Sequence, residues 1–187
     1  NVSWVKEVNG ATDGNYELDL YGGYKGAITK DLGYDIGFIT YQYPGNNSGV
    51  ANSSYSTAVT AGQYGNASTN EFYGALTYSM FTLKYNRSAG NFLGNLNSSG
   101  SGYTDLSANF DLGNGYTLTP HIGHQTVANT VNADYTDYAL TIAKDLGNGL
   151  VVSASAIGTD AKSSFYTDLR GKLIAKEALV VGLKYSF

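Results

Sequence analysis

The 187-residue chain contains no cysteine and only two prolines, and charged residues make up 14% of it. Without cysteine it forms neither a disulfide framework nor a cysteine-based metal site or nucleophile. The charged fraction lies well below the roughly 25% that is usual for soluble domains. No stretch approaches the about 20 apolar residues of a membrane-spanning helix. The 11 Lys and Arg residues are scattered, which argues against a nucleic-acid-binding surface.

Glycine (24 residues) and tyrosine (17 residues) are abundant instead, and apolar residues recur at every second position. A period of two predicts β-strands and gives no convincing helix. Each predicted strand is near the about 9–11 residues with which a tilted strand crosses a bilayer. The predicted strands are 15–28, 34–43, 71–79, 81–87, 103–112, 116–126, 135–146, 150–158 and 178–187, with a strand-like remnant at 1–6.

The connections alternate between short and long. The short ones are 29–33, 79–80 and two Gly-Asn-Gly turns at 113–115 and 147–149, which favour hairpins. The long ones, at 44–68, 88–102 and 127–133, are rich in Gly, Ser and Asn. Short turns on one rim and long loops on the other are typical of outer-membrane barrels. The segment 159–177 is predicted to be one more external loop, although 165–174 also reads as a strand.

Alternation separates an apolar face from a polar one along each strand. In 104–112, for example, Leu106 and Phe110 oppose Asp105 and Asp111. Seven tyrosines fall on the apolar side, as the aromatic girdles of a barrel require: Tyr24, Tyr34, Tyr78, Tyr85, Tyr116, Tyr138 and Tyr185. A soluble β-sandwich would also alternate, so a secreted β-protein stays open. Pro120 interrupts a strand and predicts a bulge there.

Four segments resemble the TorF-type porin family of proteobacterial outer membranes: ELDLYGGYKG, DLGYDIGFITYQYPG, EFYGALTYSMFTLKY and the terminal VVGLKYSF. The resemblance implies an all-β transmembrane antiparallel barrel in the bacterial outer membrane, in contact with lipid and lipopolysaccharide. The ending is similar to the last-strand signature that the barrel assembly machinery reads, carried here by Gly182, Tyr185 and Phe187, with Val180 where a polar residue is more usual.

The same resemblance implies a signal peptide and further strands upstream. We therefore expect 1–187 to be one barrel domain that is N-terminally incomplete, because an open sheet edge is not viable in lipid. Two added strands and a completed remnant would give twelve strands, the even number that bacterial barrels favour.

Charged residues on the polar face are the candidate pore lining: Glu17, Asp19, Lys25, Asp35, Glu71, Lys84, Asp105, Asp137 and Lys184. The excess of acids predicts a cation preference if the lumen holds water. Alternatively, these charges pair with one another and fill a narrow interior. Asp35, Asp111 and Asp145 have a further alternative, which is to accept hydrogen bonds from turn amides.

The spacing of potential catalytic residues does not indicate an enzyme. His121 and His124 face opposite ways along one strand, and no Ser-His or Asp-His spacing supports a hydrolase site, so a satisfied histidine is the expectation for His121. Two histidines and scattered carboxylates offer no metal-ligand spacing, and no cofactor is expected.

The predicted function is passive diffusion of small hydrophilic solutes, with a mouth set by the loops near 44–67 and 89–101. Tyr55, Tyr64 and Phe92 are candidates to fold inward there. The alternative is a closed barrel with a structural or surface-binding role, plugged by inward Tyr21, Tyr41, Tyr73 and Tyr103. The solute and the oligomeric state stay open.

Overall fold

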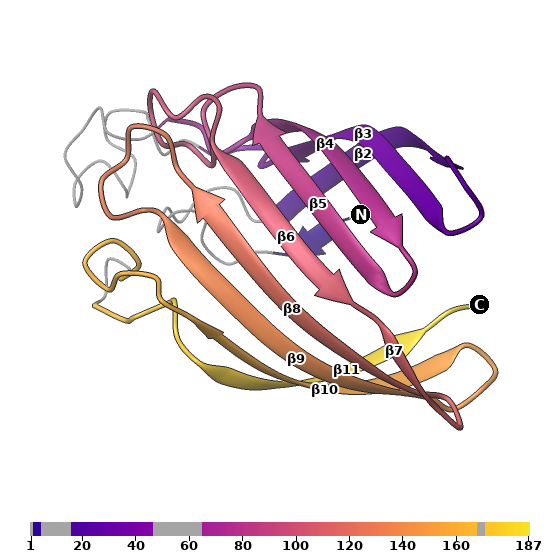
Figure 1. The fold of residues 1–187 in the computed structure, drawn as a ribbon. Coiled ribbons are helices and arrows are strands. Elements are labelled where there is room, and N and C mark those ends of the chain that lie inside the picture. Colours follow the sequence, from indigo (N-terminus) through magenta and orange to yellow (C-terminus); the bar gives the residue numbers. More distant parts are fainter. Residues whose placement is uncertain (1, 5–15, 47–64, 168–170) are drawn as a thin grey trace.

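The computed structural model describes residues 2–4, 16–46, 65–167 and 171–187. In these residues the chain forms one antiparallel sheet of eleven strands (Figure 1). None of the described residues forms a helix long and apolar enough to cross a membrane. The strands are β1 Val2–Trp4, β2 Tyr16–Ala27, β3 Leu32–Gln42, β4 Thr69–Tyr78, β5 Phe81–Ser88, β6 Gly102–Ala108, β7 Phe110–Gly113, β8 Tyr116–Thr126, β9 Tyr135–Asp145, β10 Leu150–Thr159 and β11 Ala178–Tyr185.

Each strand lies beside its neighbour in the chain, in the order β1-β2-β3-β4-β5-β6-β8-β9-β10-β11, and β7 also pairs with β8. β6 and β7 together occupy the place of the single strand predicted at 103–112. All nine predicted strands are therefore confirmed, and the remnant at 1–6 contributes β1, which pairs with β2. The all-β antiparallel prediction is confirmed.

The two ends of the sheet differ as the sequence predicts. Asn114 and Asn148 have positive φ angles of 52°, flanked by glycines that also have positive φ, so both Gly-Asn-Gly turns close hairpins. The C-terminus lies at the short-turn end, where the Ser186 amide donates to the Gly149 carbonyl at 2.8 Å. Between β10 and β11 the described residues contain only an isolated bridge, Thr167 to Leu173, so the loop prediction for 159–177 is confirmed there.

The bulge predicted at Pro120 is wrong. Pro120 lies directly opposite Leu140 in a regular β8–β9 register. On its other side the pairs Ser107–His121 and Phe110–Leu118 keep one register across the gap between β6 and β7. Proline has no N–H to donate, so the hydrogen-bond ladder between β8 and the β6–β7 side is interrupted beside Pro120. Neither side gains the extra residue that a bulge would require. The register shift lies further along, between Asp111 and Gly113 at the turn.

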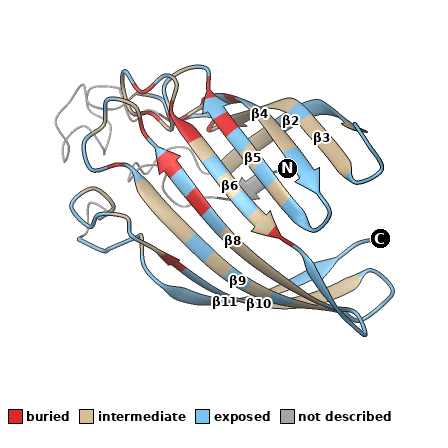
Figure 2. Ribbon diagram, in the orientation of Figure 1, coloured by how far each residue is buried: buried red, intermediate tan, exposed pale blue. Residues whose placement is uncertain are grey.

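The buried residues gather at the long-loop end (Figure 2). Many of them are polar, including Thr69, Ser98 and Ser101, whose side chains are almost completely buried. Hydrogen bonds hold the loop 89–101 there: the Leu93 amide donates to the Thr69 hydroxyl and the Phe92 amide to the Ser98 hydroxyl, both at 2.7 Å. The packed part of the molecule is thus a network of loop residues and strand ends rather than an apolar core.

Candidate functional site

The nine charged residues predicted to line a pore lie on one face of the sheet, here called the polar face. Residues directly opposite in adjacent strands point to the same side of a sheet. The register pairs Lys25 with Asp35 and Lys84 with Asp105. Pairing and the two-residue alternation place the others on the same side: Glu17, Asp19, Glu71, Asp137 and Lys184. The opposite side is the apolar face.

The polar face is concave. Glu17 of β2 and Tyr135 of β9 line one cavity of about 260 Å³, although six strand-to-strand steps separate them in the sheet. In a flat sheet six steps would place them about 29 Å apart. The sheet must therefore curl around the polar face, as its outline in Figure 1 also indicates.

His121 bridges two carboxylates in the middle of this face. Its Nδ1 lies 2.5 Å from Asp105 Oδ2, and its Nε2 lies 2.7 Å from Asp137 Oδ1. An imidazolium has a donor on each ring nitrogen and satisfies both acceptors. Because both ring nitrogens are engaged by carboxylates, His121 is the satisfied histidine that was expected, and it is a contact partner of two of the predicted acids.

Tyr103 completes this cluster. Its hydroxyl lies 3.1 Å from both Asp137 carboxylate oxygens and 3.4 Å from His121 Nε2. The ring reaches them by lying across Gly123, the residue opposite both Asp105 and Asp137. A Cβ at Gly123 would lie 1.9 Å from the Tyr103 hydroxyl oxygen. Glycine at this position therefore leaves the space that Tyr103 occupies.

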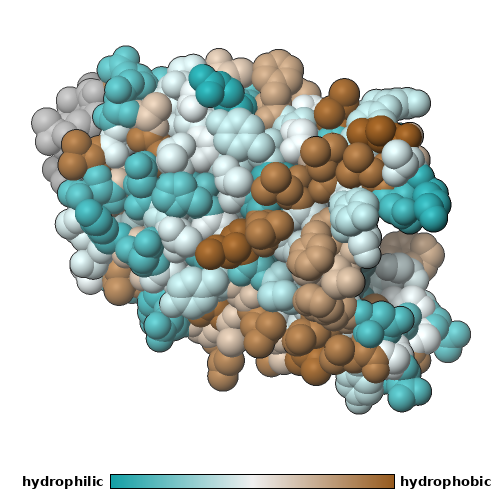
Figure 3. All heavy atoms as spheres, in the orientation of Figure 1, coloured by the Kyte–Doolittle hydropathy of each residue, from teal (hydrophilic) through white to brown (hydrophobic). Residues whose placement is uncertain are grey.

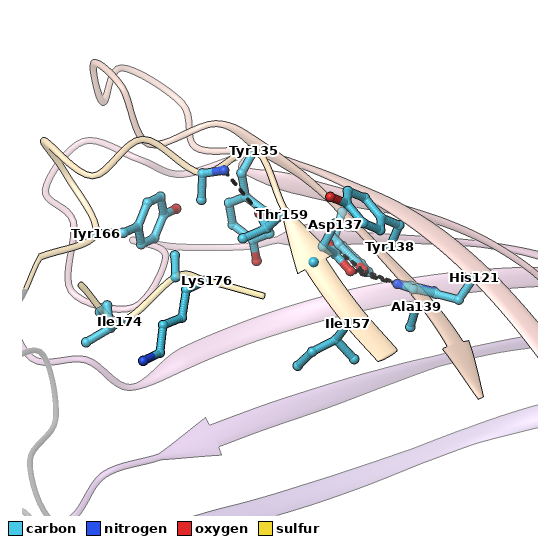
Figure 4. Close-up of a pocket in the computed structure, with 14 residues that line it drawn as sticks. His121, Tyr135, Asp137, Tyr138, Ala139, Ile157, Thr159, Tyr166, Ile174 and Lys176 are labelled. Carbon is cyan, nitrogen blue, oxygen red and sulfur yellow. Dashed lines mark hydrogen bonds and ion pairs between the residues drawn. The ribbon is translucent and has the colours of Figure 1, made fainter. Parts of the chain in front are cut away.

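A cavity of about 450 Å³ opens beside the cluster, between the sheet and the loop that follows β10 (Figure 4). His121, Asp137 and Tyr135 line it from the sheet, and Tyr166 and Lys176 line it from the loop. The Tyr166 hydroxyl donates to the Ala133 carbonyl at 2.5 Å, and its ring packs edge-on against Tyr135 at 5.5 Å. Tyr103 and Tyr135 also line the 260 Å³ cavity, so they form the wall between the two.

The 260 Å³ cavity lies toward the long loops and contains two predicted acids. Asn86 donates to Glu71 Oε2 at 3.0 Å, and the Tyr43 hydroxyl donates to Glu17 Oε2. Burial, followed by the hydrogen bond and the charge of Glu17, raises the pKa of Tyr43 above its ordinary value. Phe92, a predicted mouth residue, lines this cavity, whereas Tyr55 and Tyr64 lie outside the described residues.

Four further charged residues of the sequence analysis have local partners, namely Asp35, Lys84, Asp111 and Asp145. The Tyr73 hydroxyl donates to Asp35 Oδ1 at 3.2 Å, and Lys84 Nζ lies 4.6 Å from the centre of the Tyr73 ring. Asp111 and Asp145 accept backbone N–H groups of Gly113 and Gly147 at 2.8 and 2.7 Å. The alternative reading of Asp111 and Asp145 as turn residues is thereby confirmed, whereas Asp35 bonds a side chain.

Sequence reasoning missed the buried amides of this face. Asn86 and Gln125 are 9% and 3% exposed, and both line the cavity near the long loops. Their positions alternate with apolar-face residues, so the period of two could have placed them on the polar face. In the described part of the chain, no three acidic or histidine side chains are grouped to hold a metal ion.

The three residues of the expected assembly signal lie in and beyond the last strand. Gly182 is on the polar face opposite Ser153, while Tyr185 is on the apolar face. The Tyr185 and Phe187 rings are 6.1 Å apart, and both are exposed.

A family model described as "Bacterial protein of unknown function (Gcw_chp)" matches residues 2–187. The chain belongs to the Gcw_chp family. No curated protein matches this Gcw_chp chain. Among solved structures, OccAB3 of Acinetobacter baumannii is similar to it, with 12% identity, a TM-score of 0.48 and coverage of 92% of this chain. The chain spans about half of that protein, 48% of its length.

Proposed function

We propose that this protein forms a channel in the bacterial outer membrane through which small hydrophilic solutes diffuse. The observation that carries the proposal is the opposite character of the two faces of one curled sheet. The concave face carries the charged residues and tyrosine hydroxyls, and the convex face exposes large apolar side chains. The resemblance to TorF-type porins points the same way.

The apolar face exposes many large apolar side chains, and on the side seen in Figure 3 they gather over the short-turn half of the molecule. The members of this band are about half exposed or more and come from neighbouring strands: Leu20, Ile36, Phe72, Leu83, Leu106, Ile122, Leu140, Leu179, Val181 and Leu183. Contiguous apolar patches on monomeric soluble proteins rarely exceed a few hundred Å². Such a band is stable against lipid and costly against water, which favours a membrane protein over a secreted soluble one.

The edges of the band also support the proposal that the apolar face lies against lipid. Toward the short turns it ends in aromatic residues, including Tyr24, Tyr78 and Tyr116. Lys144 returns charge to the apolar face there, with its Nζ 4.2 Å from the centre of the Tyr116 ring. At the long-loop edge of the band, the polar residues Arg87 and His124 lie on the apolar face. Aromatic girdles and flanking charges mark the two membrane interfaces of such barrels.

We further propose that the role is not enzymatic. His121 is the histidine of the concave face, and both its ring nitrogens are engaged by carboxylates. Neither nitrogen is then available to activate a hydroxyl nucleophile, which requires a base within hydrogen-bond reach. Lipopolysaccharide around the rim and the assembly machinery at β11 are the partners that this proposal implies.

The experiment is single-channel recording of the full-length protein in a planar bilayer under a KCl gradient. Discrete conductance steps are the expected result, and a cation-selective reversal potential would in addition support the predicted cation preference. Silence from protein whose fold is verified by heat-dependent gel mobility would overturn the channel. It would favour the closed barrel, which the packing of Phe92 and Leu93 into the concave face supports.

A further inference from the structure

The cavity between Glu17 and Glu71 differs in charge from the rest of the concave face. Among the described residues, its lining contains these two carboxylates and no Lys, Arg or His. In the neighbouring cluster, His121 lies between Asp105 and Asp137, and Lys84 is opposite Asp105. The acids in the middle of the polar face thus have His121 and Lys84 beside them, whereas the described lining of this cavity offers Glu17 and Glu71 no basic side chain.

Of the side chains that line this cavity, Glu71 is the one most affected by the missing positive charge. It is 7% exposed, so it is more than nine-tenths buried, and it lines the cavity. Its Oε2 accepts a hydrogen bond from the Asn86 side-chain amide at 3.0 Å. A buried carboxylate is costly unless it is paired, and the Asn86 amide carries no charge, so Glu71 favours a positively charged partner in the cavity.

The rest of the lining indicates what kind of cation fits. Tyr41, Tyr43, Tyr103 and Tyr135 surround the cavity. Tyrosine ring faces attract ammonium groups, and their hydroxyls accept N–H donors. The volume of about 260 Å³ lies below the about 300–1,000 Å³ of sites for drug-sized ligands, so the ligand is small. A neutral solute would leave both carboxylates without a countercharge.

We propose that this cavity binds small organic cations, namely ammonium compounds with a short apolar part. Glu71 and Glu17 supply the countercharge, and the tyrosines and Phe92 enclose the apolar part. The inference extends the proposed channel, since a cation held here lies on the concave face along which solutes would pass.

Binding is tested without conduction, by calorimetric titration of the detergent-folded full-length protein with n-butylammonium chloride. n-Butanol is the uncharged comparator of the same chain length, and KCl controls for ionic strength. Saturable binding of n-butylammonium, with butanol at least about tenfold weaker, is the expected result, because a charge-assisted hydrogen bond is lost. Equal binding of both, or no binding by folded protein, overturns the inference.

Two isosteric variants locate the site. Glu71→Gln and Glu17→Gln should each weaken n-butylammonium binding about tenfold or more. Glu177→Gln, at an exposed carboxylate outside the cavity, is the matched control and should bind as the wild type does. If both cavity variants keep wild-type affinity, the inference is wrong. Should one variant fail to fold, as judged by gel mobility, the other still decides.

The binding and channel experiments can fail separately. Ammonium binding by a protein that never conducts would sustain this inference and remove the proposed channel. Conduction without ammonium binding would leave the channel and remove this inference. If both hold, n-butylammonium should reduce the K⁺ current of the wild type and do so less in Glu71→Gln.

Discussion

The contact between Tyr103 and Gly123 gives a sharp test of the central cluster. In Gly123→Ala, the new Cβ would lie 1.9 Å from the Tyr103 hydroxyl oxygen and 2.5 Å from Cζ. The ring must then swing away, and its hydroxyl leaves Asp137 and His121. Losing a hydrogen bond to a charged group is worth about 1.5–3 kcal/mol, and we expect the free energy of unfolding to fall by that amount.

The matched control is Gly22→Ala. Gly22 also lies within a strand, but a Cβ there meets nothing within 4 Å. We expect that variant to change stability by no more than about 0.5 kcal/mol. Both are measured by urea unfolding of the detergent-folded protein, with the folded fraction read from gel mobility.

A double-mutant cycle removes the remaining ambiguity. In a Tyr103→Ala background the obstructing ring is gone, so adding Gly123→Ala should have little further effect. Equal losses for Gly123→Ala and Gly22→Ala would refute the reasoning. So would an undiminished loss in the Tyr103→Ala background, because the strain would then arise from the backbone and not from the tyrosine.

Three further predictions follow from individual contacts. His121→Asn removes the imidazole that contacts both Asp105 and Asp137, whose side chains are 19% and 27% exposed. We expect the free energy of unfolding in urea to fall by about 1–3 kcal/mol, less than for a fully buried pair. The reversal potential should shift toward cations. An unchanged reversal potential would contradict the assignment of this cluster to the lumen. Asp145→Ala leaves the Gly147 amide without its acceptor and should lower stability by about 1 kcal/mol, whereas Asp145→Asn, which keeps an acceptor, should lose less. Tyr43→Phe should lower stability by about 1–2 kcal/mol at pH 8. Because the Tyr43 pKa is raised, its contribution is complete below the unfolded value of about 10 and declines as pH rises above it, so the difference from wild type should narrow at pH 12; a constant difference would contradict the Glu17 hydrogen bond.

The strands and their faces could be predicted from the sequence because both are local properties. Alternation fixes which side each residue takes, and the Gly-Asn-Gly turns at 113–115 and 147–149 fix where neighbouring strands meet. The two-residue alternation alone was enough to place Asp105, Asp137 and His121 on the polar face.

Their partnership could not be predicted in the same way. It depends on the registers of β6, β8 and β9, and the last two are joined by a loop whose length does not set a register. The cavity at Glu71 depends in addition on curvature and on the folding of 89–101, which no local pattern encodes. The prediction of a bulge at Pro120 was wrong for a related reason. A sheet can accommodate the missing N–H donor of a proline by losing a hydrogen bond of the ladder, as well as by forming a bulge.

In the proposed membrane-spanning barrel, the positions of Lys144 and His124 on the apolar face have a consequence for the thickness of the membrane that the barrel fits. On β8, the apolar stretch is bounded by Tyr116, opposite Lys144, and by His124. These eight steps cover about 27 Å along the strand, and about 20 Å along the membrane normal at a barrel's typical tilt. A band this short matches a thin bilayer and would suffer hydrophobic mismatch in a thick one. The lipid chain length in which the protein folds best should therefore match the length of the apolar stretch between Lys144 and His124.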